Sequence, residues 1–143
     1  MAITQGMCGS FKLELLEGIH NFSVSGGDTF KMALYTGSAV LTPAAVTAYI
    51  ATNESTGTGY TAGGIALVNA GVGLTSTTAF TSFNNATWAG VSISTAGALI
   101  YNSSKANRAV ALFDFGNTYT VTAGTFSIQF PPNNSNTAVL ILS

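Results

Sequence analysis

The chain has 143 residues, of which only 6% are charged, and its formal net charge is −1. A free monomeric domain normally carries a net charge of magnitude about 2–8, so this composition favours a protein packed against copies of itself or against a partner. Four basic residues spread along the chain exclude an electrostatic footprint for nucleic acid. The apolar runs reach five residues, whereas a membrane-spanning helix needs about 20.

The N-terminal segment predicts a cytosolic origin. It lacks the basic start and apolar block of a secretory signal, and the single cysteine excludes an internal disulfide framework. We therefore expect synthesis in a reducing cytosol.

Residues 4–18 are predicted to form the one helix. Phe11, Leu15 and Ile19 recur at i, i+4 and i+8, Leu16 adds to the same apolar face, and Ser10 is a candidate cap. The acidic residues of this segment, including Glu14, fall away from that apolar face. Such a short helix needs a surface to pack on, either its own domain or a neighbouring subunit. If it docks on a neighbour, removing residues 1–18 should abolish docking and leave the rest folded.

The remaining chain reads as about eight short strands separated by turn signals. The candidate strands are 29–35, 65–69, 75–83, 87–94, 98–101, 109–113, 118–122, 125–130 and 138–142, while 41–52 is ambiguous. Strand 29–35 alternates as a half-buried strand does, and the terminal strand, apolar on both faces, is expected inside a sheet. This spacing predicts an all-β antiparallel sandwich, jelly-roll-like, as one domain over 1–143, with a helical arm at 1–22 and the sandwich at 26–143.

The stretch 97–116 is predicted to be the central structural element. Its two apolar runs flank a polar segment, 102–108, which indicates a hairpin with a long tip. The second run is apolar on both faces, so we expect it to be covered on both sides. Lys105 and Arg108 lie at the tip, where they are candidates for inter-subunit contacts alongside Phe11 and Leu15.

Catalytic and ligand-binding equipment is sparse. His20 is the only histidine, Cys8 is the only cysteine, and the carboxylates are scattered, so we predict no enzyme, no cofactor and no metal site. The glycines of the loop 53–64 lack the spacing of a nucleotide-binding loop, and Tyr60 is expected to anchor that loop. Tyr49, Tyr60 and Trp88 are the aromatics that could stack a sugar, but the core is the more favoured place for Trp88.

Four segments carry a resemblance to a known class of protein. They are MAITQGMCGSFKLELLEGIHNF, DTFKMALYTGSA, TNESTGTGYTAGG and GALIYNSSKANRAVALFDFG. In their order along the chain they resemble small virion structural proteins of tailed bacteriophages of the cyanophage and marine-phage type.

The resemblance implies a β-rich virion component present in many copies. It favours a decoration (cement) protein that stabilises the head and contacts the major capsid protein or other virion proteins, with a trimer as the expected oligomer. A tail or head–tail component, including a receptor- or carbohydrate-binding module, is the alternative.

Overall fold

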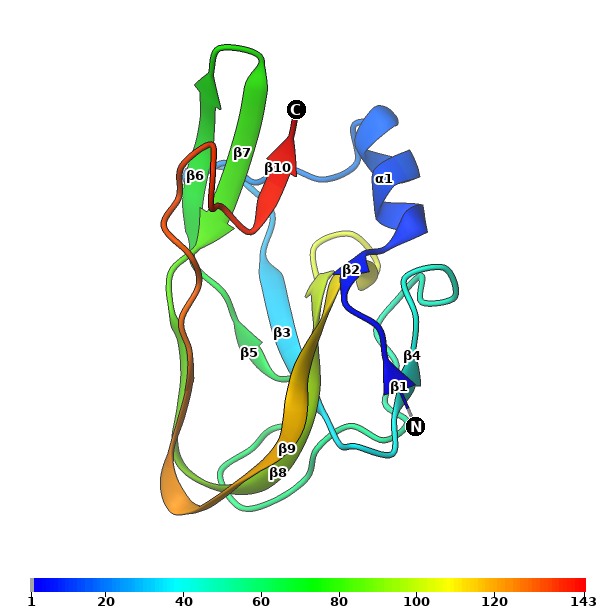
Figure 1. Cartoon of the computed structure of the whole chain (residues 1–143), viewed down its shortest axis with the longest axis vertical. Helices are drawn as coiled ribbons and strands as arrows, with labels where there is room; N and C mark the ends of the chain where they lie inside the picture. Colours follow the sequence, from blue (N-terminus) through cyan, green and yellow to red (C-terminus); the bar gives the residue numbers. More distant parts are fainter. Residues whose placement is uncertain (1) are drawn as a thin grey trace.

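The computed structural model describes residues 2–143 and is built mainly from β-strands (Figure 1). In chain order the elements are β1 Ala2–Ile3, β2 Gly6–Met7, α1 Gly9–Leu16, β3 Phe30–Tyr35, β4 Val40–Leu41, β5 Ile65–Ala66, β6 Asn69–Thr75, β7 Thr78–Phe83, β8 Ala86–Asn102, β9 Arg108–Ile128 and β10 Leu140–Leu142. All strand pairs except β1–β4 are antiparallel. The predicted all-β antiparallel class is therefore confirmed, and the jelly-roll description stays a prediction.

The predicted hairpin is the centre of the largest sheet. That sheet has five strands in the order β2-β9-β8-β3-β5. Strands β8 and β9 pair from Asn102↔Arg108 at the tip through Leu99↔Leu112. Strand β3 pairs along the other edge of β8.

β8 and β9 form one long ribbon that bends back on itself. Figure 1 shows the two strands leaving the centre together, curving at the lower end and rising toward β6 and β7. The pairing shifts register at several points along this ribbon, and Ala123 and Gly116 have positive φ angles of 46° and 80°. Such bulges bend and twist a ribbon without ending it. The two strands expected at 87–94 and 98–101 are therefore continuous within β8, and the strands expected at 118–122 and 125–130 are continuous within β9.

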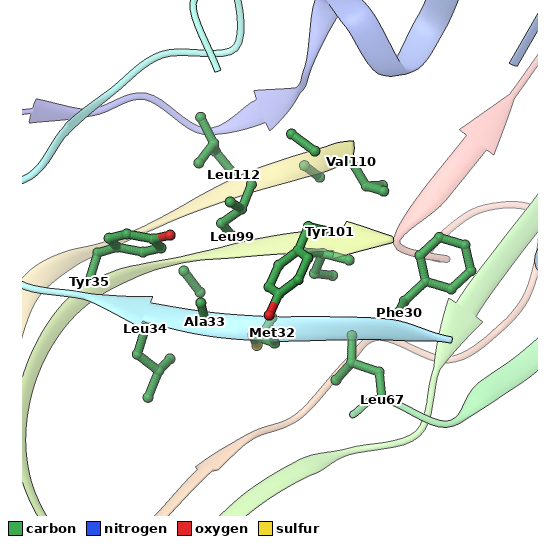
Figure 2. Close-up of a cluster of buried hydrophobic side chains, with 14 of the residues drawn as sticks. Phe30, Met32, Ala33, Leu34, Tyr35, Leu67, Leu99, Tyr101, Val110 and Leu112 are labelled. Carbon is green, nitrogen blue, oxygen red and sulfur yellow. The ribbon is translucent and has the colours of Figure 1, made fainter. Parts of the chain in front are cut away.

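The core is centred on β3 and the tip half of β8 and β9. Figure 2 shows their side chains gathered together, with Tyr35 and Tyr101 among the aliphatic residues. Every residue of β3 except Lys31 is buried, which corrects the expectation of a half-buried strand. Both faces of β3 are covered by other parts of the chain, because Phe30 stacks on Phe22 at one face and Tyr35 Oη donates to the carbonyl of Ile50 at the other.

The N-terminal helix is shorter than predicted. Residues 2–3 and 6–7 pair as strands, and α1 begins only after the extended residue Cys8, which gives it no side-chain cap. Gly6 and Met7 pair with Leu112 and Ala111 of β9. This long-range pairing outweighs the local helical pattern of residues 4–8.

A second, three-stranded sheet in the order β10-β7-β6 packs near α1 (Figure 1). The expected single strand 75–83 is interrupted by a turn at Ser76, whose φ is +54°, so β6 and β7 form a hairpin. β10 lies at the edge of this sheet, and Leu142 is 52% exposed. The terminal strand was thus wrongly expected inside a sheet, because its outward edge has no strand partner among the described residues.

Candidate interaction surface

Helix α1 places two of the four predicted contact residues on the side that faces its own chain. Phe11 is fully buried, with its ring centroid 4.9 Å from that of His20 and 6.0 Å from that of Phe22. Leu15 is half-buried against the core. The helix therefore packs on its own domain, and Phe11 has no exposed surface in this arrangement.

Glu14 joins α1 to the tip of the central hairpin. Its carboxylate accepts a hydrogen bond from Arg108 Nη1 at 2.9 Å and lies 2.8 Å from His20 Nε2. The residue is only 5% exposed, although it was expected to point away from the buried face. A carboxylate is tolerated there because both of its oxygens have a charged or polar partner.

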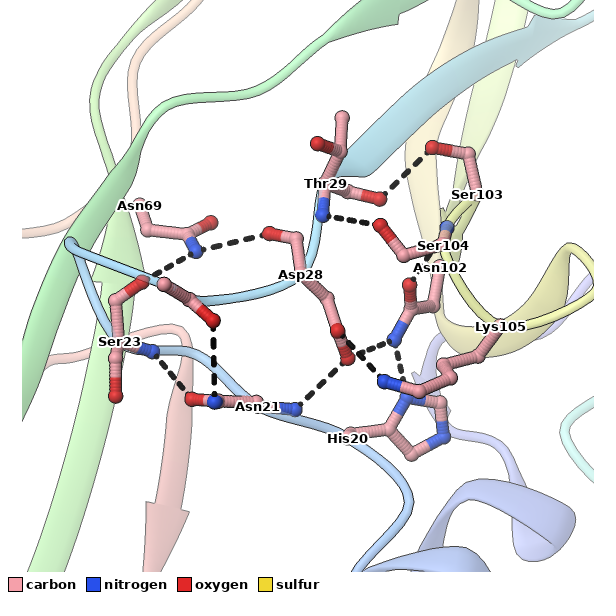
Figure 3. Close-up of polar contacts among 11 residues, drawn as sticks. His20, Asn21, Ser23, Asp28, Thr29, Asn69, Asn102, Ser103, Ser104 and Lys105 are labelled. Carbon is pink, nitrogen blue, oxygen red and sulfur yellow. Dashed lines mark hydrogen bonds and ion pairs between the residues drawn. The ribbon is translucent and has the colours of Figure 1, made fainter.

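Asn102 continues this network, as Figure 3 shows. Its Nδ2 donates to Asp28 Oδ2 at 2.8 Å and lies 2.9 Å from His20 Nδ1, while its Oδ1 accepts from the backbone N–H of Ser104 at 3.0 Å. A carboxylate accepts and a backbone N–H donates, so these two partners fix the orientation of the amide. His20 Nδ1 must then accept, which leaves its Nε2–H to donate to Glu14.

Lys105 completes the network from the exposed side. Its Nζ donates to Asp28 Oδ1 at 2.7 Å. Burial pushes the pKa of the Asp28 carboxyl upward, but hydrogen bonds from Lys105, Asn102 and the backbone of Asn21, with the positive charge of Lys105, hold that pKa below its ordinary value. Asp28 therefore stays ionised and keeps the segment before β3 attached to the hairpin tip.

The two basic residues at the tip thus have partners within their own chain. The side chains of Lys105 and Arg108 remain 41% and 43% exposed in these ion pairs. The structure brings all four predicted contact residues close to α1 or to the loop that follows it. Their role in contacts between subunits stays a prediction.

An apolar cleft of about 410 Å³ lies between α1 and the inner face of the β10-β7-β6 sheet. Its lining comes from Met7, Phe11, Leu15, Gly18, His20, Asn21, Phe22, Val72, Ala79, Phe80, Thr81, Leu140 and Leu142. None of these residues carries a formal charge when His20 is neutral. The polar groups of His20 and Thr81 are already engaged with Glu14, Asn102 and Gly71. The cleft therefore presents chiefly apolar surface.

Large apolar side chains are exposed at this end of the molecule. Val72, Leu74 and Leu142 of the β10-β7-β6 sheet are 60%, 71% and 52% exposed. On the opposite side of α1 from Phe11, Leu13 and Leu16 are 59% and 89% exposed, so the prediction that Leu16 extends the buried face of the helix is wrong. Contiguous exposed apolar surface is typical of protein interaction sites. This end of the molecule is the candidate interaction surface.

A second polar cluster, which the sequence did not predict, surrounds Glu54. Its carboxylate accepts hydrogen bonds from Tyr60 Oη at 2.7 Å, from the backbone N–H of Gly63 at 2.7 Å and from Tyr49 Oη at 2.5 Å. Tyr60 Oη also accepts from the backbone N–H of Leu34 on β3. The expected anchoring role of Tyr60 is confirmed, and Glu54 fastens the 53–64 loop from within.

At Gly64 the 53–64 loop approaches the backbone of β3 too closely to accommodate a side chain. A Cβ on Gly64, whose φ is +78°, would stand 1.7 Å from the carbonyl oxygen of Met32. Only glycine fits both this backbone conformation and this approach. Gly64 therefore allows the loop to pack directly against β3.

The tyrosines around Glu54 predict a sharp loss of stability in alkali. Burial, followed by the charge of Glu54 or a hydrogen bond to it, raises the pKa of Tyr35, Tyr49, Tyr60 and Tyr101 above the ordinary value of 10. In the unfolded chain tyrosines lose protons near pH 10. Stability is therefore fully present below pH 10 and falls as the pH rises above it.

We expect these four tyrosines to ionise only as the chain unfolds. Tyrosinate absorbance near 295 nm and far-ultraviolet circular dichroism should then change together in a titration from pH 9 to 13. Ionisation of all four tyrosines with an unchanged dichroism spectrum would contradict the expectation.

Within residues 2–143, no group of three or more histidine, cysteine or acidic side chains is placed to hold a metal ion. Cys8 is fully buried, and burial, with the nearby Glu14 charge, raises the pKa of its thiol to about 11. Trp88 is 3% exposed and packs against Phe126, so it offers no platform for a sugar.

Comparisons of the chain with protein-family models, with curated proteins and with solved structures give no match. Within residues 2–143, the one helix is too short to cross a membrane. The function proposed for the chain therefore rests on the chemistry of its surface.

Proposed function

We propose that this protein is a structural component of a virion, and specifically a decoration protein that stabilises a phage head through contacts between subunits. The observation that carries the proposal is the apolar end of the molecule, where an uncharged cleft lies between α1 and the β10-β7-β6 sheet and where both elements carry further exposed leucines. Surface of this kind is costly to leave in water and favours a partner that covers it.

The charge-poor composition supports the same conclusion. Only nine side chains are formally charged. Four of these nine, Glu14, Arg108, Asp28 and Lys105, form two ion pairs within the chain, so few charges remain to keep separate copies apart in solution. A protein with this surface suits a dense protein lattice.

A decoration protein acts through linkage. If it binds the assembled shell and not the separate capsomers, its binding free energy adds directly to the stability of the shell. The expected partner is the major capsid protein or another virion protein. The resemblance to small virion proteins of tailed bacteriophages motivates the choice of the head as the site of action.

Immunogold labelling of purified virions tests the proposal. Dense label over the head, and earlier heat disruption of particles that lack the protein, is the expected result. Label confined to the tail would replace the head assignment with a tail or head–tail role. Absence of the protein from purified and disrupted virions, measured by mass spectrometry, would refute a virion role altogether.

A further inference from the structure

Helix α1 has an outer face that its own chain does not cover. Phe11 and Glu14 point into the domain, whereas Leu13 and Leu16 are 59% and 89% exposed. Residues three apart lie on the same side of a helix, so these two leucines form one short apolar seam. Leucine on both the inner and the outer side is the pattern of a helix that is buried all round.

Opposite charges flank this seam. Lys12 precedes Leu13 and Glu17 follows Leu16, and at 100° per residue they fall on opposite borders of the outer face. Both residues are exposed, and neither takes part in an ion pair within residues 2–143. Lys12, Leu13, Leu16 and Glu17 thus occupy positions g, a, d and e of a heptad.

We propose that α1 of one copy packs in parallel against α1 of a second copy of this chain, about a rotation axis that runs along the two helices. In that arrangement Leu13 and Leu16 meet their counterparts, and Lys12 of each copy faces Glu17 of the other. An antiparallel two-fold pairing instead brings the two lysines to one side and the two glutamates to the other. Charge complementarity therefore selects a second copy in the parallel orientation.

This inference rests on the proposed role in a multi-copy assembly and names one contact within it. Eight residues of helix span only about 12 Å, so the contact is far smaller than the roughly 800 Å² per partner of a standard interface. We expect weak association of the isolated protein and stronger pairing where a shell holds copies close together. The test must therefore detect a weak contact.

Cysteine cross-linking of the full chain provides that test. In a parallel pair the two residues at position 16 are adjacent, so the Leu16→Cys variant should form an intermolecular disulfide under a mild oxidant. Val40→Cys is the matched control, since Val40 is 67% exposed on β4, outside the candidate interaction surface. Native Cys8 is fully buried and does not compete. On non-reducing gels we expect cross-linking of Leu16→Cys to be at least about tenfold faster than that of the control.

Charge reversal tests the orientation. In the Leu16→Cys background, Lys12→Glu or Glu17→Lys alone should slow cross-linking about two- to fivefold, and the two reversals together should restore it. Equal rates for Leu16→Cys and Val40→Cys would overturn the proposal. Cross-linking of a mixture of Leu13→Cys and Leu16→Cys chains, without cross-linking of Leu16→Cys alone, would also overturn it, because that result requires antiparallel helices.

The outcomes separate this contact from the wider proposal. Label on virions without preferential cross-linking at position 16 refutes the α1 contact and leaves the virion role standing. Preferential cross-linking with no protein in virions supports the contact between copies and refutes the virion role.

Discussion

Replacing Glu54 with alanine is expected to lower the free energy of unfolding by about 3 kcal/mol or more. The substitution removes the acceptor for Tyr49 Oη, Tyr60 Oη and the backbone N–H of Gly63. A buried donor left without a partner costs about 1–3 kcal/mol. The Gly63 N–H is buried, the two tyrosine hydroxyls are partly buried, and Glu54 is the acceptor that each of the three has in the structure. Urea denaturation followed by circular dichroism measures the loss.

Two variants sharpen this measurement. Glu17→Ala removes an exposed carboxylate with no ion pair in the described chain, so the change should stay within about 0.5 kcal/mol. Glu54→Gln keeps one carbonyl oxygen and should lose less stability than Glu54→Ala. Equal stability of Glu54→Ala and the unmodified chain would show that water replaces the carboxylate as the acceptor.

The central hairpin was predictable because its signal is local. Two runs of β-forming residues flank a polar tip, and the second run is apolar on both sides. Both properties can be recognised from residues that are close together in the sequence. The structure places these runs next to each other in the middle of the five-stranded sheet.

Element boundaries failed where long-range pairing or an unusual backbone decided them. Residues 6–7 have a helical pattern but pair with β9, more than 100 positions away. Ser76 turns the chain with a positive φ in a stretch that has neither the glycine nor the asparagine typical of such turns. Ala123 is the reverse case. The sequence predicts a turn at this position, but the positive φ of Ala123 belongs to a bulge, and strand β9 continues through it.

The two buried carboxylates were missed for different reasons. Glu14 meets Arg108, which is 94 residues away, and periodicity alone assigns any glutamate to the solvent side of a helix. For Glu54 a signal was present, since Tyr49 and Tyr60 lie five and six residues to either side. Tyrosines clustered about a lone acidic residue in a glycine-rich loop indicate a polar anchor of this kind.

Removing residues 1–18 is expected to prevent stable folding of the remaining chain. From the sequence alone this segment is predicted to be an arm whose deletion leaves the rest folded. In the structure it supplies a strand to each of two sheets and the buried ring of Phe11. It also supplies Glu14, so His20 and Arg108 would both lose an acceptor. We expect the chain 19–143 to lack the cooperative thermal transition of the full chain in circular dichroism.

Single substitutions separate folding from docking more cleanly than this deletion. Phe11→Ala should cost about 3–5 kcal/mol of unfolding free energy, because it opens a cavity beside Phe22 and His20. Leu16→Ala, on the exposed side of the same helix, should change it by no more than about 0.5 kcal/mol. A fully cooperative transition of chain 19–143 at an unchanged midpoint would show that the segment is an independent arm after all. If the segment is integral, as its pairing indicates, any test of what α1 binds has to change its outer face and leave Phe11 and Glu14 in place.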